Sequence, residues 1–296
     1  MERRSHGQQV EQLTGDIEIR SGHTSEALLW PFGWMRPLAT ALDYARRWIG
    51  TAFSFVLFGI GSVWLGAVAV PLVYMRVRDP QQRLVRVRAL VGHAVRFFVG
   101  FIRAVGVLEY RYEGLEHARP GASYLIVANH PTLIDIVFLL ARFPMADCVI
   151  KQRMARNPIT RQIAQAAGYL SNDDPVTLLE DAVAGLKNGR SLILFPEGTR
   201  SDASGLMSFK PGAAAIAIRS GRNCLPILIR CEPLTLTRST RWYQIPRRRA
   251  LISISVQPPV SPARVLGDAL HSRYARRRFN AWLQSYFEER LAASRF

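Results

Sequence analysis

The sequence predicts an α/β fold with a mixed, mostly parallel sheet flanked by helices and preceded by N-terminal membrane-associated helices. Downstream of about Arg111, short apolar runs alternate with segments of helical pattern. Strands separated by helices of about 10–15 residues indicate crossover units, which build parallel sheets. Upstream, Thr51 to Met75 runs for 25 residues without a charged side chain. A helix needs roughly 20 apolar residues to cross a bilayer, so this segment is long enough.

We expect three parts in the 296-residue chain. Residues 1–40 are polar and then contain tryptophan, proline and glycine, and we expect them to be disordered. Residues 41–108 are expected to attach the protein to a membrane, and residues 109–296 to form the α/β domain with a C-terminal helix. Two full domains would be tight at this length.

The apolar segment Thr51–Met75 is too long for the apolar core of a cleavable signal peptide, and it begins well inside the chain. Gly59, Gly61, Gly66 and Pro71 permit a kink or a shallow re-entrant hairpin. The segment therefore either spans the bilayer or dips into it. Arginines flank both ends, and the larger number downstream favours a cytosolic α/β domain.

The next segment, Arg83 to Val107, predicts a basic amphipathic helix on anionic headgroups. On a helix advancing about 100° per residue, its basic side chains fall within an arc of about 160°, and most other residues are apolar. The alternative is a core helix with a solvated face. The basic residues are Arg86, Arg88, His93, Arg96 and Arg103.

The α/β part contains five strand-like runs and five helical patterns. The expected strands are Ala122–Ala128, Asp147–Lys151, Ser191–Phe195, Leu225–Arg230 and Ala250–Val256. The expected helices are Thr132–Arg142, Pro158–Ala167, Pro175–Lys187, Pro211–Ser220 and Asp268–Arg290, the last with Asp268 as its N-cap.

The net charge of +17 suggests nucleic acid, an anionic membrane or an acidic substrate as partner. A codon bias toward arginine is an alternative reason for the scarcity of lysine. The sequence has no zinc-finger spacing and no stripe of interleaved aromatic residues, which argues against nucleic acid. Cys148, Cys224 and Cys231 are too few and too scattered for a disulfide framework or a metal site. Reduced core thiols are expected.

Polar blocks follow two of the strand-like runs directly. Asn129 to Asp135 reads Asn-His-Pro-Thr-Leu-Ile-Asp, and Phe195 to Arg200 reads Phe-Pro-Glu-Gly-Thr-Arg. In an open α/β sheet the carboxyl ends of the strands share one edge, where ligands bind. We therefore expect the two blocks to face each other.

His130 and Asp135 form a candidate base with an acidic partner. Helical residues at i and i+5 point about 140° apart, so both cannot lie in one helix and still meet. The geometry works if His130 precedes the helix and Pro131 takes its first position, where a missing N–H costs nothing. Asp135 can then fix the ring tautomer and leave the other nitrogen as a base. Ordinary capping is the alternative, and the block at Glu197–Arg200 weighs against it.

These motifs resemble those of the glycerolipid acyltransferases, the 1-acylglycerol-3-phosphate or lysophospholipid acyltransferase family. His-x4-Asp stands at His130 and Asp135, and Pro-Glu-Gly-Thr-Arg at Pro196–Arg200. An aromatic–basic–x–Gly element at Phe209–Gly212 and a hydrophobic–Pro–hydrophobic element at Leu225–Ile227 follow in order. Four elements in sequence make the match specific.

The resemblance implies a glycerol-3-phosphate acyltransferase-like fold and transfer of an acyl group from a thioester to a lysophospholipid hydroxyl, giving phosphatidic acid from 1-acylglycerol-3-phosphate. His130 would be the general base, oriented by Asp135. No metal and no cofactor are expected, because acyl-CoA or acyl-ACP (acyl carrier protein) serves as co-substrate. The absence of a Gly-x-Ser-x-Gly elbow agrees with transfer that needs no enzyme nucleophile.

The resemblance also assigns the acceptor-binding residues. Arg200, with its planar fork, and Lys151 would bind acceptor phosphate. Glu197 would position Arg200 or an acceptor hydroxyl, and Gly198 would let the loop backbone approach the ligand. Thr199 belongs to the same block, with loop bracing as its favoured role. The residues of a possible pocket are Asn129, Phe209, Lys210 and Gly212, although Asn129 is expected to brace the turn and Gly212 could start a helix.

One departure concerns the family's second block, which usually ends in glycine, a few apolar residues and an arginine. Here Gly168–Asp174 contains no arginine and two acids. The alternative acceptor is therefore a non-phosphorylated or specialised lipid of the ornithine-lipid or aryl polyene type.

The expected partners are a membrane lipid and the acyl donor, without nucleic acid. We expect a bacterial-type inner (cytoplasmic) membrane with the catalytic domain on its cytosolic side. A non-enzymatic membrane-associated protein of this fold is the first competing class, and a basic nucleic-acid-binding protein the second. Acceptor identity, acyl-chain length, donor carrier and oligomeric state stay open.

Overall fold

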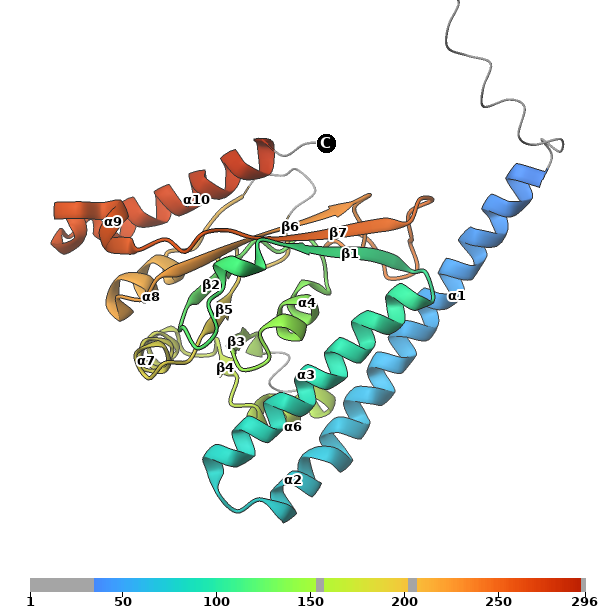
Figure 1. Cartoon of the computed structure of the whole chain (residues 1–296), viewed down its shortest axis with the longest axis horizontal. Coiled ribbons are helices and arrows are strands. Elements are labelled where there is room, and N and C mark those ends of the chain that lie inside the picture. Colours follow the sequence, from blue (N-terminus) through green and yellow to red (C-terminus); the bar gives the residue numbers. More distant parts are fainter. Residues whose placement is uncertain (1–34, 153–156, 202–206, 294–296) are drawn as a thin grey trace, which may run out of the picture. The chain divides into compact units, whose positions relative to one another are not determined.

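The computed structural model describes residues 35–152, 157–201 and 207–293, so most of the predicted disordered segment 1–40 lies outside the described residues (Figure 1). The chain divides into two compact units, residues 1–43 and residues 44–296. The second unit contains the sheet and both polar blocks.

The apolar segment is helical throughout. It covers most of α1 (Met35–Trp64), a π-helical turn (Leu65–Ala69) and α2 (Val70–Arg76), and α3 (Pro80–Ala104) follows. The π turn ends two residues before Pro71, whose ring removes a backbone donor and disturbs the regular α-helical ladder. The chain does not reverse within Thr51–Met75, as a re-entrant hairpin would require. It reverses after the segment, where Asp79 caps α3 by accepting the N–H of Gln82.

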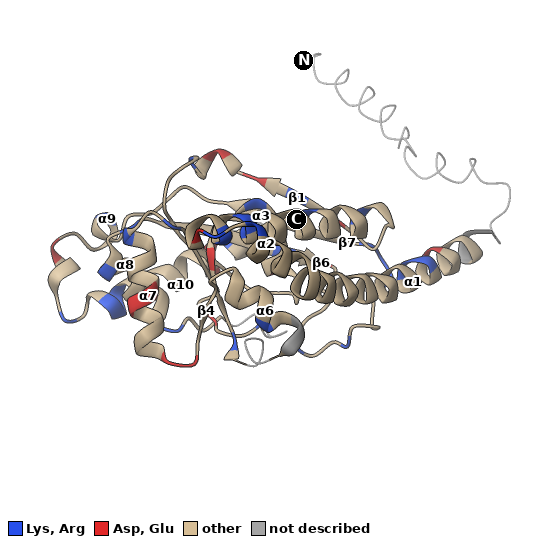
Figure 2. Cartoon of the chain, turned by 90° about the horizontal axis from the view of Figure 1, so that it is seen from below, with Lys and Arg blue, Asp and Glu red and all other residues tan. Residues whose placement is uncertain are grey.

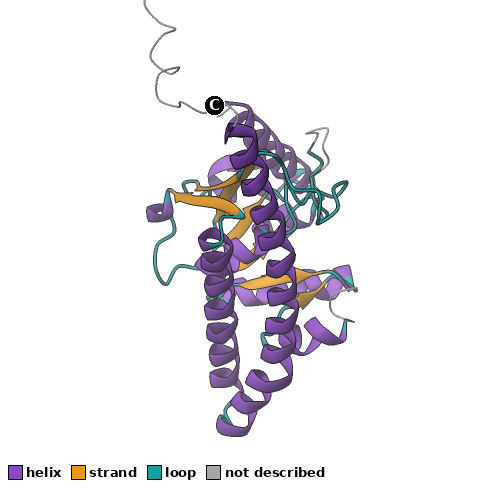
Figure 3. Cartoon of the chain, turned by 90° about the vertical axis from the view of Figure 1, so that its right-hand side faces the viewer, coloured by secondary structure: helices purple, strands orange, loops and turns teal. Residues whose placement is uncertain are grey.

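Helices α1 and α3 run side by side in the second unit (Figure 3). Two aromatic pairs join them: Phe53 with Phe101, at 5.7 Å between ring centroids, and Phe58 with Phe98, at 5.2 Å. Many large apolar side chains of α1 remain exposed, among them Ile49, Phe53, Val56, Ile60 and Trp64.

The predicted basic face of α3 is only partly correct. Arg86, His93, Arg96 and Arg103 are exposed, whereas Arg88 is buried. The Arg88 guanidinium forms an ion pair with Asp147 and donates to the carbonyls of Met145 and Ala167. The side of α3 that carries Arg88 packs against α4 and α6. On this side the helix is a core helix, as the alternative interpretation stated.

The sheet has seven strands in the order β1-β7-β6-β2-β5-β3-β4, and every neighbouring pair is parallel except β6 with β7. It is therefore mixed and mostly parallel, as predicted. All five predicted strands are present, Ala250–Val256 with the predicted bounds and the other four with shifted ends, and β1 and β4 are additional. The strands are β1 (Leu108–Glu113), β2 (Leu125–Ala128), β3 (Asp147–Ile150), β4 (Leu170–Ser171), β5 (Leu192–Leu194), β6 (Cys224–Glu232) and β7 (Ala250–Val256).

Helices follow the strands as crossover connections (Figure 1). The predicted terminal helix Asp268–Arg290 is divided, because Ser272 adopts extended backbone angles (φ −75°, ψ 152°) that end a short 3-10 helix before the last α-helix begins. Asp268 therefore lies in a short 3-10 helix (Gly267–His271) and is not the N-cap of the last helix. The helices are α4 (Asp135–Arg142), α6 (Pro158–Ala166), α7 (Pro175–Lys187), α8 (Gly212–Ser220), α9 (Pro262–Leu266) and α10 (Ala275–Ala293), with a further 3-10 turn at Leu115–His117.

The two faces of the sheet bury separate hydrophobic clusters. Ile126 and Ile193 pack with α3 and α4, whereas Leu125 and Leu192 pack with α7, α8 and α10. Successive strand residues point to opposite faces, so a strand buried on both sides is apolar along its whole length. The three cysteines are buried and free, which confirms the prediction of reduced core thiols. Burial raises the pKa of the Cys224 thiol to about 12.

Candidate active site

His130 lies in the turn that follows β2, at the carboxyl edge of the parallel strands. Its Nδ1–H donates to Oδ2 of Asp135 over 2.7 Å, which confirms the predicted contact. The prediction that Pro131 opens the helix is wrong, because α4 begins only at Asp135. The Asp135 carboxylate reaches back over the turn and also accepts the backbone N–H and the hydroxyl of Thr132.

The Asp135 side chain is fully buried. Burial raises the pKa of this carboxyl, while the hydrogen bonds from His130 and Thr132 oppose the rise. Three donors satisfy the carboxylate, so it can remain in the interior and hold the ring in one tautomer. Nε2 of His130 then carries the lone pair, and it has no hydrogen bond within the part of the chain that the structure describes. This nitrogen is in a position to accept a proton.

The ring of Phe195 stacks on one face of the His130 imidazole. The two ring centroids lie 4.1 Å apart at an interplanar angle of 18°, and 18% of the His130 side chain is exposed. Sequence reasoning placed Phe195 in a strand and did not assign it to the site, although its position directly before the Pro-Glu-Gly-Thr-Arg motif was the available signal.

Glu197 joins the two polar blocks. Its Oε1 accepts the backbone N–H of His130 over 3.0 Å and the hydroxyl of Ser201 over 3.1 Å. The backbone N–H of Ser201 in turn donates to the His130 carbonyl over 2.8 Å. The expectation that the blocks face each other is confirmed. These bonds of Glu197 go to the His130 turn and to Ser201, and none of its hydrogen bonds within the described chain goes to Arg200.

Burial raises the pKa of the Glu197 carboxyl, although its two hydrogen bonds oppose the rise. A carboxyl with a higher pKa in the folded state binds its proton more tightly there, so the free energy of unfolding falls as the pH rises from the ordinary value of 4.5 through the raised one. We expect Glu197→Gln, which keeps an acceptor oxygen, to show a smaller fall in melting temperature over this range. Thermal unfolding of both proteins at a series of pH values measures it, and identical slopes would contradict it.

Arg200 is half-buried and anchored to the segment after β6. Its Nη1 donates to the carbonyls of Leu236, over 3.0 Å, and Thr237, over 2.6 Å. The same Leu236 carbonyl accepts the N–H of Leu133 from the His130 turn. One end of the guanidinium therefore holds the loops together, and its other N–H groups have no hydrogen-bond partner among the described residues.

Lys210 brings a cation to the Pro-Glu-Gly-Thr-Arg loop. Gly198 has a φ of +67°, and a Cβ there would lie 3.0 Å from Cε and Nζ of Lys210. Glycine is thus needed both for its backbone conformation and for the close approach of the lysine side chain. Lys151 is exposed directly after β3, at the same edge of the sheet, and Thr199 is half-buried in the loop.

The remaining residues of the possible pocket have other positions. Asn129 is buried and exchanges two hydrogen bonds with the backbone of Ile229, so it braces the end of β2 against β6. Phe209 packs in the hydrophobic core at 5.3 Å from the ring of Phe287. Gly212 is the first residue of α8, as the helix-start alternative proposed.

Comparison with known proteins agrees with this geometry. Residues 109–230 match the family model described as Acyltransferase. A 1-acyl-sn-glycerol-3-phosphate acyltransferase from Limnanthes douglasii is 26% identical over 215 residues, which are 70% of this chain and 72% of that protein. A lyso-ornithine lipid O-acyltransferase from Pseudomonas aeruginosa is 28% identical over 174 residues, which are 57% of this chain and 65% of that protein.

The fold agrees as well. The crystal structure of the 1-acyl-sn-glycerophosphate (LPA) acyltransferase PlsC from Thermotoga maritima aligns with a TM-score of 0.61 at 22% identity, over 86% of this chain and 99% of that one. Sequence and fold therefore agree: residues 109–230 match the acyltransferase family, and the chain has the fold of this solved acyltransferase structure.

Proposed function

We propose that this O-acyltransferase moves a fatty acyl group from a thioester to the free hydroxyl of a lysophospholipid-type acceptor, with lysophosphatidic acid as the first acceptor to test. The observation that carries the proposal is the imidazole of His130, oriented by the buried Asp135 and open at Nε2. The relatives named 1-acyl-sn-glycerol-3-phosphate acyltransferase support this choice of acceptor.

In this mechanism Nε2 of His130 removes the proton of the acceptor hydroxyl. The oxygen attacks the thioester carbonyl, a carbon–oxygen bond forms, and the carbon–sulfur bond breaks. The thiolate leaves readily, because thiol pKa values lie near about 8.5, and it takes the proton back from the imidazolium. Asp135 stabilises the imidazolium and need not become protonated itself. The acyl donor, acyl-CoA or acyl-ACP, is a substrate.

Three cations at the carboxyl edge support a phosphate-bearing acceptor. Lys210 covers Gly198, and Lys151 is exposed after β3. Arg200 has N–H groups beyond Nη1 that are not bonded to the described residues. We propose that these cations bind acceptor phosphate while Glu197 keeps the His130 turn in place. An arginine fork and a lysine point charge both suit a phosphate group. Basic residues are otherwise spread over many elements of the chain (Figure 2).

We propose that the N-terminal helices hold the enzyme on the membrane that contains its lipid acceptor. Among the described residues, one continuous helical stretch, Leu38–Arg76, is long and apolar enough to cross a bilayer by length and composition, with a mean hydropathy of 2.2 over its most apolar window. Its exposed apolar side chains would otherwise face water. A bacterial inner membrane, with the catalytic domain on the cytosolic side, is the location that we propose.

A second acceptor class is favoured by one specific observation. Where the family pattern has an arginine, the segment after Gly168 forms β4 and ends in two acids, with Asp173 exposed and Asp174 serving as the N-cap of α7. The relative named lyso-ornithine lipid O-acyltransferase provides a matching precedent. A lyso-ornithine lipid is therefore the second acceptor.

The experiment uses the full chain in detergent with a labelled acyl thioester and, in parallel, lysophosphatidic acid and lyso-ornithine lipid. Formation of the corresponding diacyl product by the wild type, and its loss with His130→Ala, is the expected result. Folded protein that acylates neither acceptor with acyl-CoA or acyl-ACP would overturn the proposal.

A further inference from the structure

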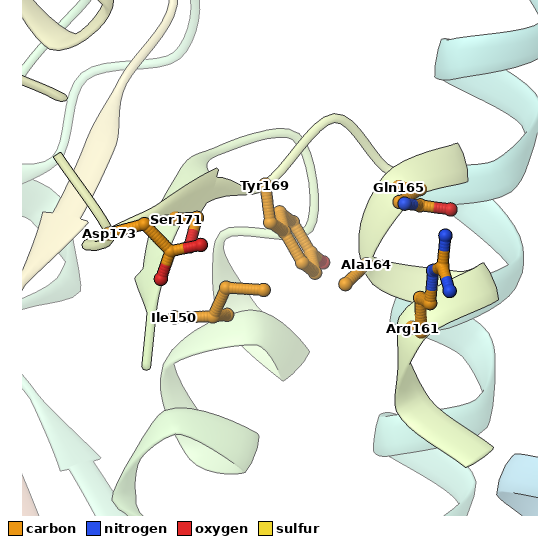
Figure 4. Close-up of a pocket in the computed structure, with 7 residues that line it drawn as sticks. All are labelled: Ile150, Arg161, Ala164, Gln165, Tyr169, Ser171 and Asp173. Atoms are coloured by element: carbon orange, nitrogen blue, oxygen red, sulfur yellow. The ribbon is translucent and has the colours of Figure 1, made fainter. Parts of the chain in front are cut away.

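A cavity of about 430 Å³ opens at the carboxyl ends of β3 and β4, against α6 (Figure 4). It is separate from the contacts that hold His130, Asp135 and Glu197. The residues that line it are Ile150, Arg161, Ala164, Gln165, Tyr169, Ser171 and Asp173.

The cavity lies on the same edge and the same face of the sheet as the imidazole. Ile150, Tyr169 and Phe195 all pack against the hydrophobic cluster on the α4 face. Because Cys148 pairs with Ile193, continuation of the register by two residues brings Ile150 beside Phe195, which stacks on His130. Neighbouring strands are about 4.8 Å apart, so β3 and β4 lie roughly 10–14 Å from β2. One lipid headgroup can extend over that distance.

Two polar atoms of the cavity lack a partner. The hydroxyls of Tyr169 and Ser171 are buried, and neither has a hydrogen bond within the described part of the chain. Buried hydroxyl groups are nearly always paired, because losing water without a replacement costs free energy. Burial also raises the pKa of Tyr169, so its phenol stays protonated and can donate. Both hydroxyls have almost no accessible surface, so a ligand in the cavity would supply the missing partners once either side chain rotates toward it.

Opposite charges stand at the two ends of the cavity. Arg161 comes from α6 and Asp173 follows β4, and the ring of Tyr169 lies between them (Figure 4). Both residues are exposed, and neither forms an ion pair with any residue that the structure describes. A ligand with a single negative charge would meet an unfavourable carboxylate at one end. A ligand with both charges would be complementary to the whole cavity.

We infer that this cavity is the acceptor-headgroup subsite and that it takes a zwitterionic lysolipid. In such an acceptor Arg161 binds the carboxylate or phosphate, in place of the three cations proposed for the phosphate of lysophosphatidic acid. Asp173 binds the ammonium group, and the hydroxyls of Tyr169 and Ser171 turn toward the polar atoms between them. This inference rests on the proposed acyl transfer and specifies its substrate class. Two lipid headgroups share the chemistry: an ornithine amide, with a carboxylate, and phosphoethanolamine, with a phosphate.

The test measures kcat/KM of the full chain for lyso-ornithine lipid, lysophosphatidylethanolamine and lysophosphatidic acid. We expect Asp173→Asn to lower the ratio of kcat/KM for the zwitterionic acceptors to that for lysophosphatidic acid by about tenfold, the value of a lost charged hydrogen bond. Asp181→Asn, which removes an exposed charge from α7 outside the cavity, is the matched control and should leave the ratio unchanged. The larger kcat/KM of the two zwitterionic acceptors shows whether the anionic group is a carboxylate, as in lyso-ornithine lipid, or a phosphate, as in lysophosphatidylethanolamine.

A chemical change in the acceptor provides an independent readout. Acetylation of the ornithine side-chain amine removes the ammonium charge, and it should reduce turnover by the wild type far more than turnover by Asp173→Asn. Equal effects in the two proteins, or a wild type that acylates only lysophosphatidic acid, would overturn the subsite while leaving acyl transfer intact. Binding of lyso-ornithine lipid that weakens in Asp173→Asn, without turnover by any protein, would instead retain the subsite and overturn the proposed function.

Discussion

Replacement of His130 by alanine is expected to lower kcat for acyl transfer by roughly 10²–10⁴, the contribution of a well-placed general base. The loss should leave the fold in place, because the hydrogen bonds that hold the turn run through the backbone of residue 130 to Glu197 and Ser201. Initial rates at saturating thioester, compared with the melting temperature of the same preparation, measure the two effects separately.

His93 provides the control for this substitution. It is an exposed histidine on α3 whose Nδ1 contacts the carbonyl of Ala89 in its own helix, so His93→Ala should keep wild-type kcat. Asp135→Asn should also lower kcat, and in the His130→Ala background it should cause little further loss, because residues that act as one unit are not additive. Full acyl transfer by His130→Ala would show that another group is the base.

The local part of the site could be predicted from sequence, and the non-local part could not. The spacing of His130 and Asp135 required a turn that precedes a helix, and the ring contact follows from that requirement. The anchoring of Arg200 depends on carbonyls of Leu236 and Thr237, in a segment with no motif of its own. Nothing in the local pattern around Arg200 indicates which segment folds against it.

The fold shows the same division. Strands buried on both faces, such as β2 and β5, are continuous apolar runs and were identified. Strand β1, at one edge of the sheet, alternates apolar with charged residues, which is the pattern of a half-buried strand and was an available signal, whereas β4 has only two residues and gave none. For α3, angular spacing placed Arg88 with the solvated arginines, because its partner Asp147 lies 59 residues further along the chain.

That ion pair leads to the second large expected effect. Arg88 and Asp147 have side-chain exposures of 4% and 2%, and Arg190 contributes a further, partly exposed contact to Asp147. Removal of one member of a buried pair costs about 3–5 kcal/mol when the remaining charge has no other partner, and the lower end of that range applies here because Asp147 would keep its contact with Arg190. We therefore expect Arg88→Ala to lower the free energy of unfolding by about this amount, as measured by denaturant unfolding in detergent.

Arg86→Ala is the matched comparison, because it removes an exposed arginine two positions away on the same helix, and such surface changes are usually worth less than about 0.5 kcal/mol. The double variant Arg88→Met with Asp147→Asn should regain part of the loss, since it removes both charges. Equal stability of Arg88→Ala and Arg86→Ala would contradict the prediction.

Arg88 also donates to the carbonyls of Met145 and Ala167, which precede β3 and β4. Its loss should therefore loosen the two strands whose carboxyl ends form the proposed headgroup subsite.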